Sequence, residues 1–519
     1  MFDFPPQGVS KPATKERLAF FALVTLIIAA GAWLRMKDAL AASFPINDGG
    51  LHFVLIQELV ANHFRLPMIT SYNHLSIPFV YPPLSTYFAA FVHVWFGIDI
   101  LKILTLAPPL FAVGTLVGFA WVAHLALIER RATIGALYCF AIAPWVWVQA
   151  IKGGGLPRGL GLLFALLAIG FALRICRKKP NMMRHATYTG AFLGLTALSH
   201  PEAALFGGIS VAYLLLTSAD NPRTAMKSLV VLGLVAFVVL CPWVLVVSLR
   251  HGLSAFASAA SSNDVSILTN VILFLKLQMP IWDGQLIPYI AGLVGLVLCL
   301  RKHVWLAGWC LAVLIGCVRG TPIYLSVVLA ILGGLAFSGV IAWCAPLTFP
   351  INKRLVRALA AALLVFELVE TGRMIPRSTN NPLQSLSAFD REAAQWAMSN
   401  TPPDVRFHIV TGSRGWWNDP ITEWFPALAR RRSDATCQGS EWLPAHKFHH
   451  CLERYDALQN CLRLSTECLQ QLAQMSKQDF VYVSRNLAVS DHFLYFLATN
   501  KEFIEVFRNN GVRIFRRES

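Results

Sequence analysis

The sequence consists of long apolar runs separated by short clusters of lysine and arginine. A helix that crosses a membrane needs about 20 predominantly apolar residues, or somewhat fewer inside a bundle. The runs therefore predict a polytopic α-helical membrane protein with about eleven spans. The predicted spans are residues 18–36, 103–127, 133–150, 157–175, 186–199, 201–218, 228–249, 286–300, 304–318, 321–345 and 356–372.

The composition excludes an ordinary soluble domain. Of the 519 residues, 56% are hydrophobic and only 14% are charged. The net charge of +16 would suit a nucleic-acid-binding protein, but the lysines and arginines lie between the apolar runs. Cations in that position indicate membrane topology and contact with lipid head groups. We therefore expect membrane lipids as partners and no nucleic acid.

The placement of the cations also predicts the orientation of the chain. With the N-terminus in the cytoplasm, the cytoplasmic connections carry most of the lysines and arginines, as the positive-inside rule requires. This asymmetry holds throughout only if the short apolar segment 84–97 lies at the outer membrane surface without crossing. An odd number of spans then places the C-terminus outside. The cytoplasmic cations are Arg130, Arg131, Arg174, Arg177, Lys178, Lys179, Arg184, Arg223, Lys227, Arg301, Lys302, Lys353, Arg354 and Arg357.

These observations divide the chain into two parts. Residues 1–375 form a transmembrane module with a long first external loop at 37–102. The character of the sequence changes after about residue 376, and a linker pattern lies at 378–382. Residues 376–519 are expected to form a soluble extracytoplasmic α/β domain. The protein is thus predicted to be a multi-pass protein of the plasma (inner) membrane.

The second part shows alternating patterns typical of a mixed domain. Residues 406–411 and 480–484 are predicted strands, 391–398 and 421–429 are predicted helices, and 503–515 is a predicted hairpin. Its four cysteines suit an oxidising compartment, although their pairing cannot be deduced. Aromatic and charged residues from Trp416 to Trp442 suit either sugar binding or docking onto the membrane surface. The cysteines are Cys437, Cys451, Cys461 and Cys468.

Asp48 is a carboxylate in the first loop outside the predicted bilayer. A local interpretation is that Asn47 or Asp48 caps a helix beginning near Leu51. A functional interpretation makes Asp48 a general base or, together with His52 one helical turn away, a ligand of a divalent metal such as Mg²⁺ or Mn²⁺. Gly49, which follows Asp48, would let a bulky substrate approach the backbone.

Other candidate residues lie at the outer ends of the predicted spans. The segment from Lys152 to Arg158 encloses three glycines, and its N–H groups and cations could bind a phosphate, although a flexible turn is the alternative. His200 and Glu202 could bind substrate, or could satisfy each other or a helix end. Tyr81 opens a Tyr-Pro-Pro-Leu sequence that closes the Asp48 loop, and a rigid helix entry would also explain it.

The combination of these motifs resembles the GT-C superfamily of polytopic glycosyltransferases, which includes protein O-mannosyltransferases, aminoarabinose transferases and oligosaccharyltransferase catalytic subunits. The resemblance rests on Asp48 in the first external loop, the sequence from Tyr81 to Leu84, the glycine-rich turn and the Ser-His-Pro-Glu sequence at 199–202. It implies transfer of a sugar from a polyprenyl-phosphate donor to an extracytoplasmic acceptor, with Asp48 as the catalytic residue.

The residues predicted to bind substrate are Lys152, Arg158, His200, Glu202 and Tyr81. The acceptor would be a glycan, a lipid or a protein. Some members of the superfamily need a divalent metal, but here Gly49 and Gly50 follow Asp48 in place of a second acid, so metal dependence stays open. Two other functions are compatible with a polytopic chain, a transporter or flippase of lipid-linked glycans and a non-catalytic membrane scaffold.

Overall fold

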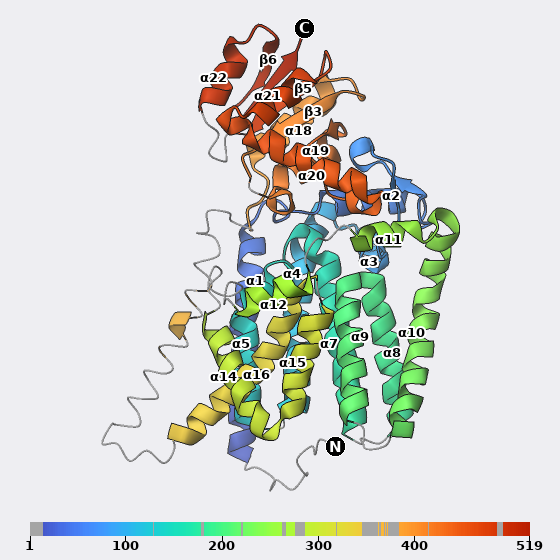
Figure 1. Cartoon of the computed structure of the whole chain (residues 1–519), viewed down its shortest axis with the longest axis vertical. Helices are drawn as coiled ribbons and strands as arrows, with labels where there is room; N and C mark the ends of the chain where they lie inside the picture. Colours follow the sequence, from blue (N-terminus) through green and yellow to red (C-terminus); the bar gives the residue numbers. More distant parts are fainter. Residues whose placement is uncertain are drawn as a thin grey trace.

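The structure is a computed structural model in which two parts are distinct. A bundle of long helices forms one part, and a smaller domain that contains a β-sheet packs on one end of it (Figure 1). The predicted linker at 378–382 and most of the predicted span at 356–372 lie outside the described residues. The structure describes residues 14–127, 129–177, 181–218, 222–261, 266–275, 286–317, 319–344, 362, 365–367, 369, 371, 383–413, 415–484 and 491–518.

The long helices of the bundle lie where the apolar runs predicted spans. Among the described residues, 5 helices are long and apolar enough to cross a membrane, so the chain is an integral membrane protein. The total of about eleven spans stays a prediction. The bundle contains α1 (Thr14–Ala41), α4 (Ile100–Leu127), α5 (Arg130–Ile142), α7 (Leu156–Cys176), α8 (Met182–Ser199), α9 (Pro201–Ser218), α10 (Pro222–His251), α14 (Leu286–Lys302), α15 (Val304–Gly316) and α16 (Thr321–Cys344).

The prediction of one continuous span at 133–150 is wrong. Helix α5 ends at Ile142, and a single turn, α6 (Pro144–Trp147), follows after Ala143 in an extended conformation. Pro144 explains the break, because proline lacks an N–H group and its ring clashes with the preceding helical turn. The chain then continues irregularly to the glycine-rich turn, η2 (Gly153–Gly155).

Arg35 of α1 satisfies part of the broken helix end. The last carbonyls of a helix have no partner within it, and Arg35 Nη1 donates to Ala141 O at 3.0 Å while Nη2 donates to Phe140 O at 3.4 Å. Its guanidinium also lies 5.6 Å from the Trp147 ring centroid. This fully buried cation therefore fixes the irregular segment that leads to the glycine-rich turn.

The Asp48 loop, residues 42–83, joins α1 to a short apolar helix. It contains α2 (Gly50–Ala61), the two-stranded pair β1 (Ile69–Thr70) and β2 (Ile77–Pro78), and a 3₁₀ turn, η1 (Tyr72–His74). The helix that follows, α3 (Leu84–Phe96), has 13 residues. Such a helix is about 20 Å long, against about 30 Å for a hydrocarbon core, but α5 and α15 have the same length. That residues 84–97 do not cross the membrane stays a prediction.

The smaller domain is built on a five-stranded mixed sheet with strand order β4-β3-β5-β7-β6. Strands β4, β3 and β5 are parallel, whereas β7 pairs antiparallel with both β5 and β6. The expected strands at 406–411 and 480–484 correspond to β3 and β5, and the expected hairpin to β6 and β7. The strands are β3 (Arg406–Val410), β4 (Arg432–Ser433), β5 (Phe480–Ser484), β6 (Phe503–Arg508) and β7 (Val512–Arg517).

Helices cover this sheet, and two disulfides lie within residues 437–468. Cys437 is bonded to Cys451, and Cys461 is bonded to Cys468, a pairing that the sequence left open. Each bridge closes a short loop, which restricts the unfolded chain. The elements are α18 (Ala388–Asn400), η3 (Trp416–Asn418), α19 (Pro420–Ala429), η4 (Ser440–Trp442), α20 (Ala445–Gln459), η5 (Asn460–Arg463), α21 (Thr466–Ala473) and α22 (Asp491–Thr499).

The Asp48 loop and the C-terminal domain share one hydrophobic core. Phe44, Leu51 and Ile56 from the loop belong to the same buried cluster as Trp424 and Phe425 of α19. A β-bridge between 46 and 385 adds a backbone connection. The loop is thus held between the bundle and the domain, as the blue α2 beneath the orange α19 and α20 illustrates (Figure 1). This arrangement fixes the position of Asp48.

Candidate active site

Asp48 contacts the glycine-rich turn and does not cap α2. Its Oδ1 accepts a hydrogen bond from the Gly154 N–H at 2.8 Å, and its Oδ2 lies 3.4 Å from Arg158 Nη1. The N-cap of α2 is Gly49, and no side chain of the cap residue bonds to the helix. The local interpretation of Asp48 as a helix cap is therefore wrong, because its carboxylate points to a turn more than 100 positions away.

Small residues on both sides of this contact allow the approach. A Cβ atom at Gly154 would lie 2.9 Å from Asp48 Cγ, and one at Gly153 would lie 2.1 Å from Asp48 O. Gly49 has φ +130°, a conformation that side chains disfavour. The glycines on which a phosphate cradle was predicted thus serve, in this structure, to admit the Asp48 backbone and carboxylate.

Each N–H group of the glycine-rich turn already has an acceptor within the protein. Gly153 N donates to Ile46 O at 2.8 Å, and Gly155 N donates to Lys152 O at 2.8 Å. Gly154 N is the donor to Asp48. These N–H groups are therefore not available to bind a phosphate in this structure. The cations at the two ends of the turn, Lys152 and Arg158, remain candidates for phosphate binding.

Lys152 and Arg158 have different surroundings. Lys152 is fully buried, and its Nζ lies 3.3 Å from Asn418 Oδ1, which also accepts from Asn47 Nδ2 at 3.0 Å. Burial lowers the pKa of Lys152 to about 8. The side chain of Arg158, in contrast, is 33% exposed. Lys152 thus connects the turn to the C-terminal domain, whereas Arg158 is open to a ligand.

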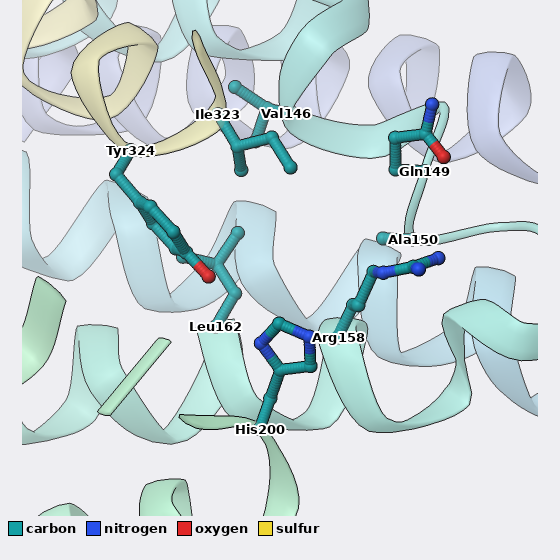
Figure 2. A pocket seen from close by; sticks show the side chains of 8 residues that line it. All are labelled: Val146, Gln149, Ala150, Arg158, Leu162, His200, Ile323 and Tyr324. Atoms are coloured by element: carbon teal, nitrogen blue, oxygen red, sulfur yellow. The ribbon is translucent and has the colours of Figure 1, made fainter. Parts of the chain in front are cut away.

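Arg158 and His200 line one pocket at the end of the bundle. Its walls also include Gln149, from the irregular segment after α6, and Tyr324 of α16. Figure 2 shows the Arg158 and His200 side chains side by side, from the start of α7 and the α8–α9 junction. The pocket therefore lies directly beside the Asp48–Arg158 contact. Two of the residues predicted to bind substrate meet here.

Tyr81 lies among the same charged groups. Its ring makes an edge-to-face contact with His52, with centroids 5.0 Å apart, and another with Trp442 at 5.9 Å. Burial raises the pKa of the Tyr81 hydroxyl, the Arg158 charge lowers it, and the charges of three acids raise it further. The three acids are Glu202, Glu441 and Asp48. Tyr81 therefore lies within electrostatic reach of both predicted carboxylates.

The described residues do not provide a full set of metal ligands. No group of three or more His, Cys, Asp or Glu side chains in this part of the chain is placed to hold an ion. Both carboxylate oxygens of Asp48 have protein partners, and the ring of His52 packs on Tyr81. Mg²⁺ and Mn²⁺ favour about six oxygen-rich ligands. Asp48 and His52 would supply two at most, so no catalytic step is assigned to a metal.

Residues of the C-terminal domain that contact the Asp48 loop were not predicted as site residues. Glu423 Oε1 accepts from the Gly49 N–H at 2.9 Å, and Trp424 Nε1 donates to Asn47 O at 2.9 Å. Trp424 is completely buried, so it does not dock onto a membrane surface. The sequence showed only an aromatic and charged cluster, because nothing local indicates its distant partner.

The helical bundle, the Asp48 loop and the attached mixed sheet together have the same fold as solved structures of ArnT, of an archaeal oligosaccharyltransferase and of an arabinofuranosyltransferase. This confirms the resemblance seen in the sequence at the level of the fold. Neither a protein-family profile nor a curated protein matches the chain. The likeness is therefore structural, at sequence identities of 13–16%.

Three solved structures illustrate the likeness. ArnT from Cupriavidus metallidurans in the apo state has a TM-score of 0.58 and 16% identity, covering 96% of this chain and 98% of its own. The archaeal oligosaccharyltransferase AglB from Archaeoglobus fulgidus has a TM-score of 0.54 and 13% identity, covering 91% and 70%. Arabinofuranosyltransferase AftD from Mycobacteria has a TM-score of 0.52 and 14% identity, covering 98% and 42%.

Proposed function

We propose that this chain is a glycosyltransferase that moves a sugar from a polyprenyl-phosphate donor to an acceptor on the extracytoplasmic side of the membrane. The observation that carries the proposal is the placement of Asp48, held by the Gly154 N–H and Arg158 beside a pocket lined by Arg158 and His200. The ArnT structure with undecaprenyl phosphate and the AglB structure with dolichol phosphate support a lipid-phosphate donor.

The proposed reaction is a displacement at the anomeric carbon of the donor sugar. An acceptor hydroxyl forms the new bond to this carbon while the bond to the lipid phosphate oxygen breaks, and the bonding electrons leave with the phosphate. Asp48 accepts the proton from the attacking hydroxyl as general base. The activated lipid provides the driving force, so the reaction needs no nucleotide. The acceptor is a glycan, a lipid or a protein.

Arg158 has the clearest role in substrate binding. Negative charge accumulates on the departing phosphate, and a preorganised cation next to Asp48 stabilises it. Its contact to Asp48 Oδ2 is long, at 3.4 Å, and a third of the side chain is exposed, so the guanidinium has donors available for a phosphate. Lys152, which is buried at the other end of the glycine-rich turn, adds positive charge to the site.

His200, Glu202 and Tyr81 are proposed to shape the donor site. His200 lines the same pocket as Arg158. Glu202 lies next to the Gly320 backbone, where a Cβ atom would be 3.0 Å from Glu202 Oε2. Such a carboxylate can accept hydrogen bonds from sugar hydroxyls, and the Tyr81 hydroxyl can donate to a phosphate or sugar oxygen.

The orientation of the chain is part of the proposal. The predicted cytoplasmic connections are rich in lysine and arginine, which places the N-terminus inside and the C-terminal domain outside the plasma (inner) membrane. The disulfides Cys437–Cys451 and Cys461–Cys468 support an oxidising environment for that domain. Asp48, which packs against the domain through Gly49, is then on the outer side.

The dependence of transfer on a divalent metal is to be tested by experiment. A structure of the Archaeoglobus fulgidus oligosaccharyltransferase was obtained in complex with Zn and sulfate. In the present chain, Asp48 and His52 are the residues that the sequence offers as ligands. Transfer measured with EDTA and then with added Mg²⁺ or Mn²⁺ decides the point: a metal role predicts loss with the chelator and recovery with the ion.

The function is tested with Asp48→Asn in membranes that contain the full chain. Labelled undecaprenyl-phosphate pentoses and hexoses are supplied as donors, and label in the acceptor fraction is measured. Asp38→Asn is the matched control, because Asp38 lies at the end of α1 and pairs only with the neighbouring Lys37 in the contacts that the structure shows. We expect transfer by the control and loss of transfer by Asp48→Asn. Wild-type transfer by Asp48→Asn would contradict the proposed function.

A further inference from the structure

Helix α2 begins directly after Asp48 and lacks a cap from its own segment. Its N-cap residue is Gly49, which has no side chain to accept a hydrogen bond. The first N–H groups of a helix have no partner within it and carry a partial positive charge. An acceptor is therefore needed at this end of α2, and the adjacent Asp48 carboxylate is turned away toward Gly154.

Glu423 of the C-terminal domain supplies this acceptor. Its Oε1 accepts from the Gly49 N–H at 2.9 Å, across 374 positions of the chain, and the Leu51 N–H interacts with the same carboxyl group. Glu423 lies in the first turn of α19, so its own helix fixes its direction. A carboxyl group at a helix start is stabilising because it meets the exposed N–H groups.

The neighbouring contacts hold the Glu423 backbone against the loop. The Tyr72 hydroxyl donates to Glu423 O at 2.6 Å, and Trp424 Nε1 donates to Asn47 O at 2.9 Å. A Cβ atom at Gly50 would lie 2.5 Å from Glu423 O, so a residue larger than glycine would force the two segments apart. Residues of both the Asp48 loop and α19 therefore contribute to this contact, which includes more than the Glu423 carboxyl group.

We propose that Glu423 is a positioning residue, which caps α2 from the C-terminal domain and so leaves the Asp48 carboxylate free to face Gly154 and Arg158. This inference rests on the proposed function for its catalytic part. If Glu423 is removed, Asp48, the carboxylate that precedes α2 in the chain, can satisfy the start of the helix, since aspartate next to a helix start readily caps it. Capping by Asp48 would withdraw it from Arg158.

The structural part of the proposal is tested by hydrogen–deuterium exchange on the full chain in detergent. Glu423→Ala removes the acceptor, whereas Glu423→Gln keeps an oxygen that accepts from the Gly49 N–H. Glu453→Ala is the matched control, because Glu453 is an exposed residue of α20 in the same domain. We expect amides 49–53 to exchange at least about tenfold faster in Glu423→Ala alone. Equal protection in Glu423→Ala and wild type would overturn the capping role.

The catalytic part is tested in the transfer assay with the same variants. We expect Glu423→Ala to lower kcat at least about tenfold while KM for the lipid-linked donor changes little, and Glu423→Gln to restore most of the rate. Faster exchange of residues 49–53 with an unchanged kcat would show a cap without a positioning role and would overturn this part.

A further variant distinguishes a local effect at Glu423 from a general folding defect. Glu423→Asp keeps the carboxyl group but shortens the side chain by one methylene, so it should give intermediate exchange and intermediate kcat. Faster exchange throughout β3 and β5 would show that the C-terminal domain itself unfolds. If the protection of amides 49–53 and kcat were lost together with that unfolding, a local role of Glu423 would be contradicted. Wild-type transfer by Asp48→Asn would contradict the proposed function only. The exchange experiment would still test whether Glu423 caps α2.

Discussion

The Asp48 carboxylate accepts a hydrogen bond from the Gly154 N–H at 2.8 Å, although 106 positions of the chain separate the two residues. The same carboxylate is 3.4 Å from Arg158 on the first turn of α7. The first long loop and the glycine-rich turn therefore form one structural unit. An acid held in this way has a fixed position beside Arg158, which lines the pocket.

The first prediction concerns Gly154→Ala. The new Cβ atom would lie 2.9 Å from Asp48 Cγ and would displace the carboxylate. We expect kcat for sugar transfer to fall at least about tenfold, because small displacements of a catalytic group have large effects on rate. Gly208→Ala on α9 is the matched control, since a Cβ atom there meets nothing within 4 Å. Equal rates in the two variants would contradict the importance of this contact.

A second prediction concerns Arg158→Lys. Lysine keeps the positive charge but loses the planar guanidinium, which can contact Asp48 and a phosphate oxygen at once. Transfer should fall about 10–100-fold, with a higher KM for the lipid-linked donor. Arg174→Lys, on the same helix near its other end, provides the comparison. If both substitutions were equally mild, Arg158 would not hold the phosphate.

The pH dependence of stability gives a third prediction. Burial and the neighbouring Asp48 charge raise the pKa of Glu423 from 4.5 to about 8. The folded state therefore favours the protonated form, so this contribution to stability is complete below pH 4.5 and disappears as the pH rises through about 8. We expect the unfolding temperature of the wild type, relative to Glu423→Gln, to fall between about pH 4.5 and about pH 8 and to level off above that.

The comparison with Glu423→Gln is needed because other buried groups also titrate. Burial raises the pKa of Asp419 to about 6 and that of Glu441 to about 7, so these acids act in the same direction. Burial lowers the pKa of Lys152 to about 8, and its contribution is instead lost as the pH falls. The effects of Asp419 and Glu441 are common to both proteins and cancel in the difference, whereas the pKa of Lys152 also depends on the Glu423 charge. A pH-independent difference would contradict the assignment to Glu423.

The sequence is most informative about the helical bundle. In a membrane, apolar runs have few alternatives to helices, and cations between them indicate the orientation. The break after Ile142 was not predicted, because the residues on both sides of Pro144 are apolar and a proline inside a membrane helix is often tolerated. The broken helix end is satisfied by Arg35, a buried cation of α1 that donates to Ala141 O.

The candidate site was predicted in part. A lone carboxylate beside a membrane span identified Asp48, and the cation at the glycine-rich turn identified Arg158. Local rules could not decide between a helix cap and a functional group, since both interpretations of Asp48 suit the start of α2. The structure excludes the helix cap, because the Gly49 N–H donates to Glu423 from another domain, and the functional role of Asp48 stays a proposal. Such a partner leaves no signal in the sequence near Asp48.

The most direct test of the account separates donor binding from transfer in Asp48→Asn. Binding of a labelled undecaprenyl-phosphate sugar and single-turnover transfer are measured on the same purified chain. The account predicts donor affinity within about threefold of wild type, because Arg158 is retained, and transfer slower by about 10²–10⁴-fold, the usual contribution of a general base. Transfer at the wild-type rate, or a loss of transfer fully explained by lost donor binding, would contradict Asp48 as the catalytic residue.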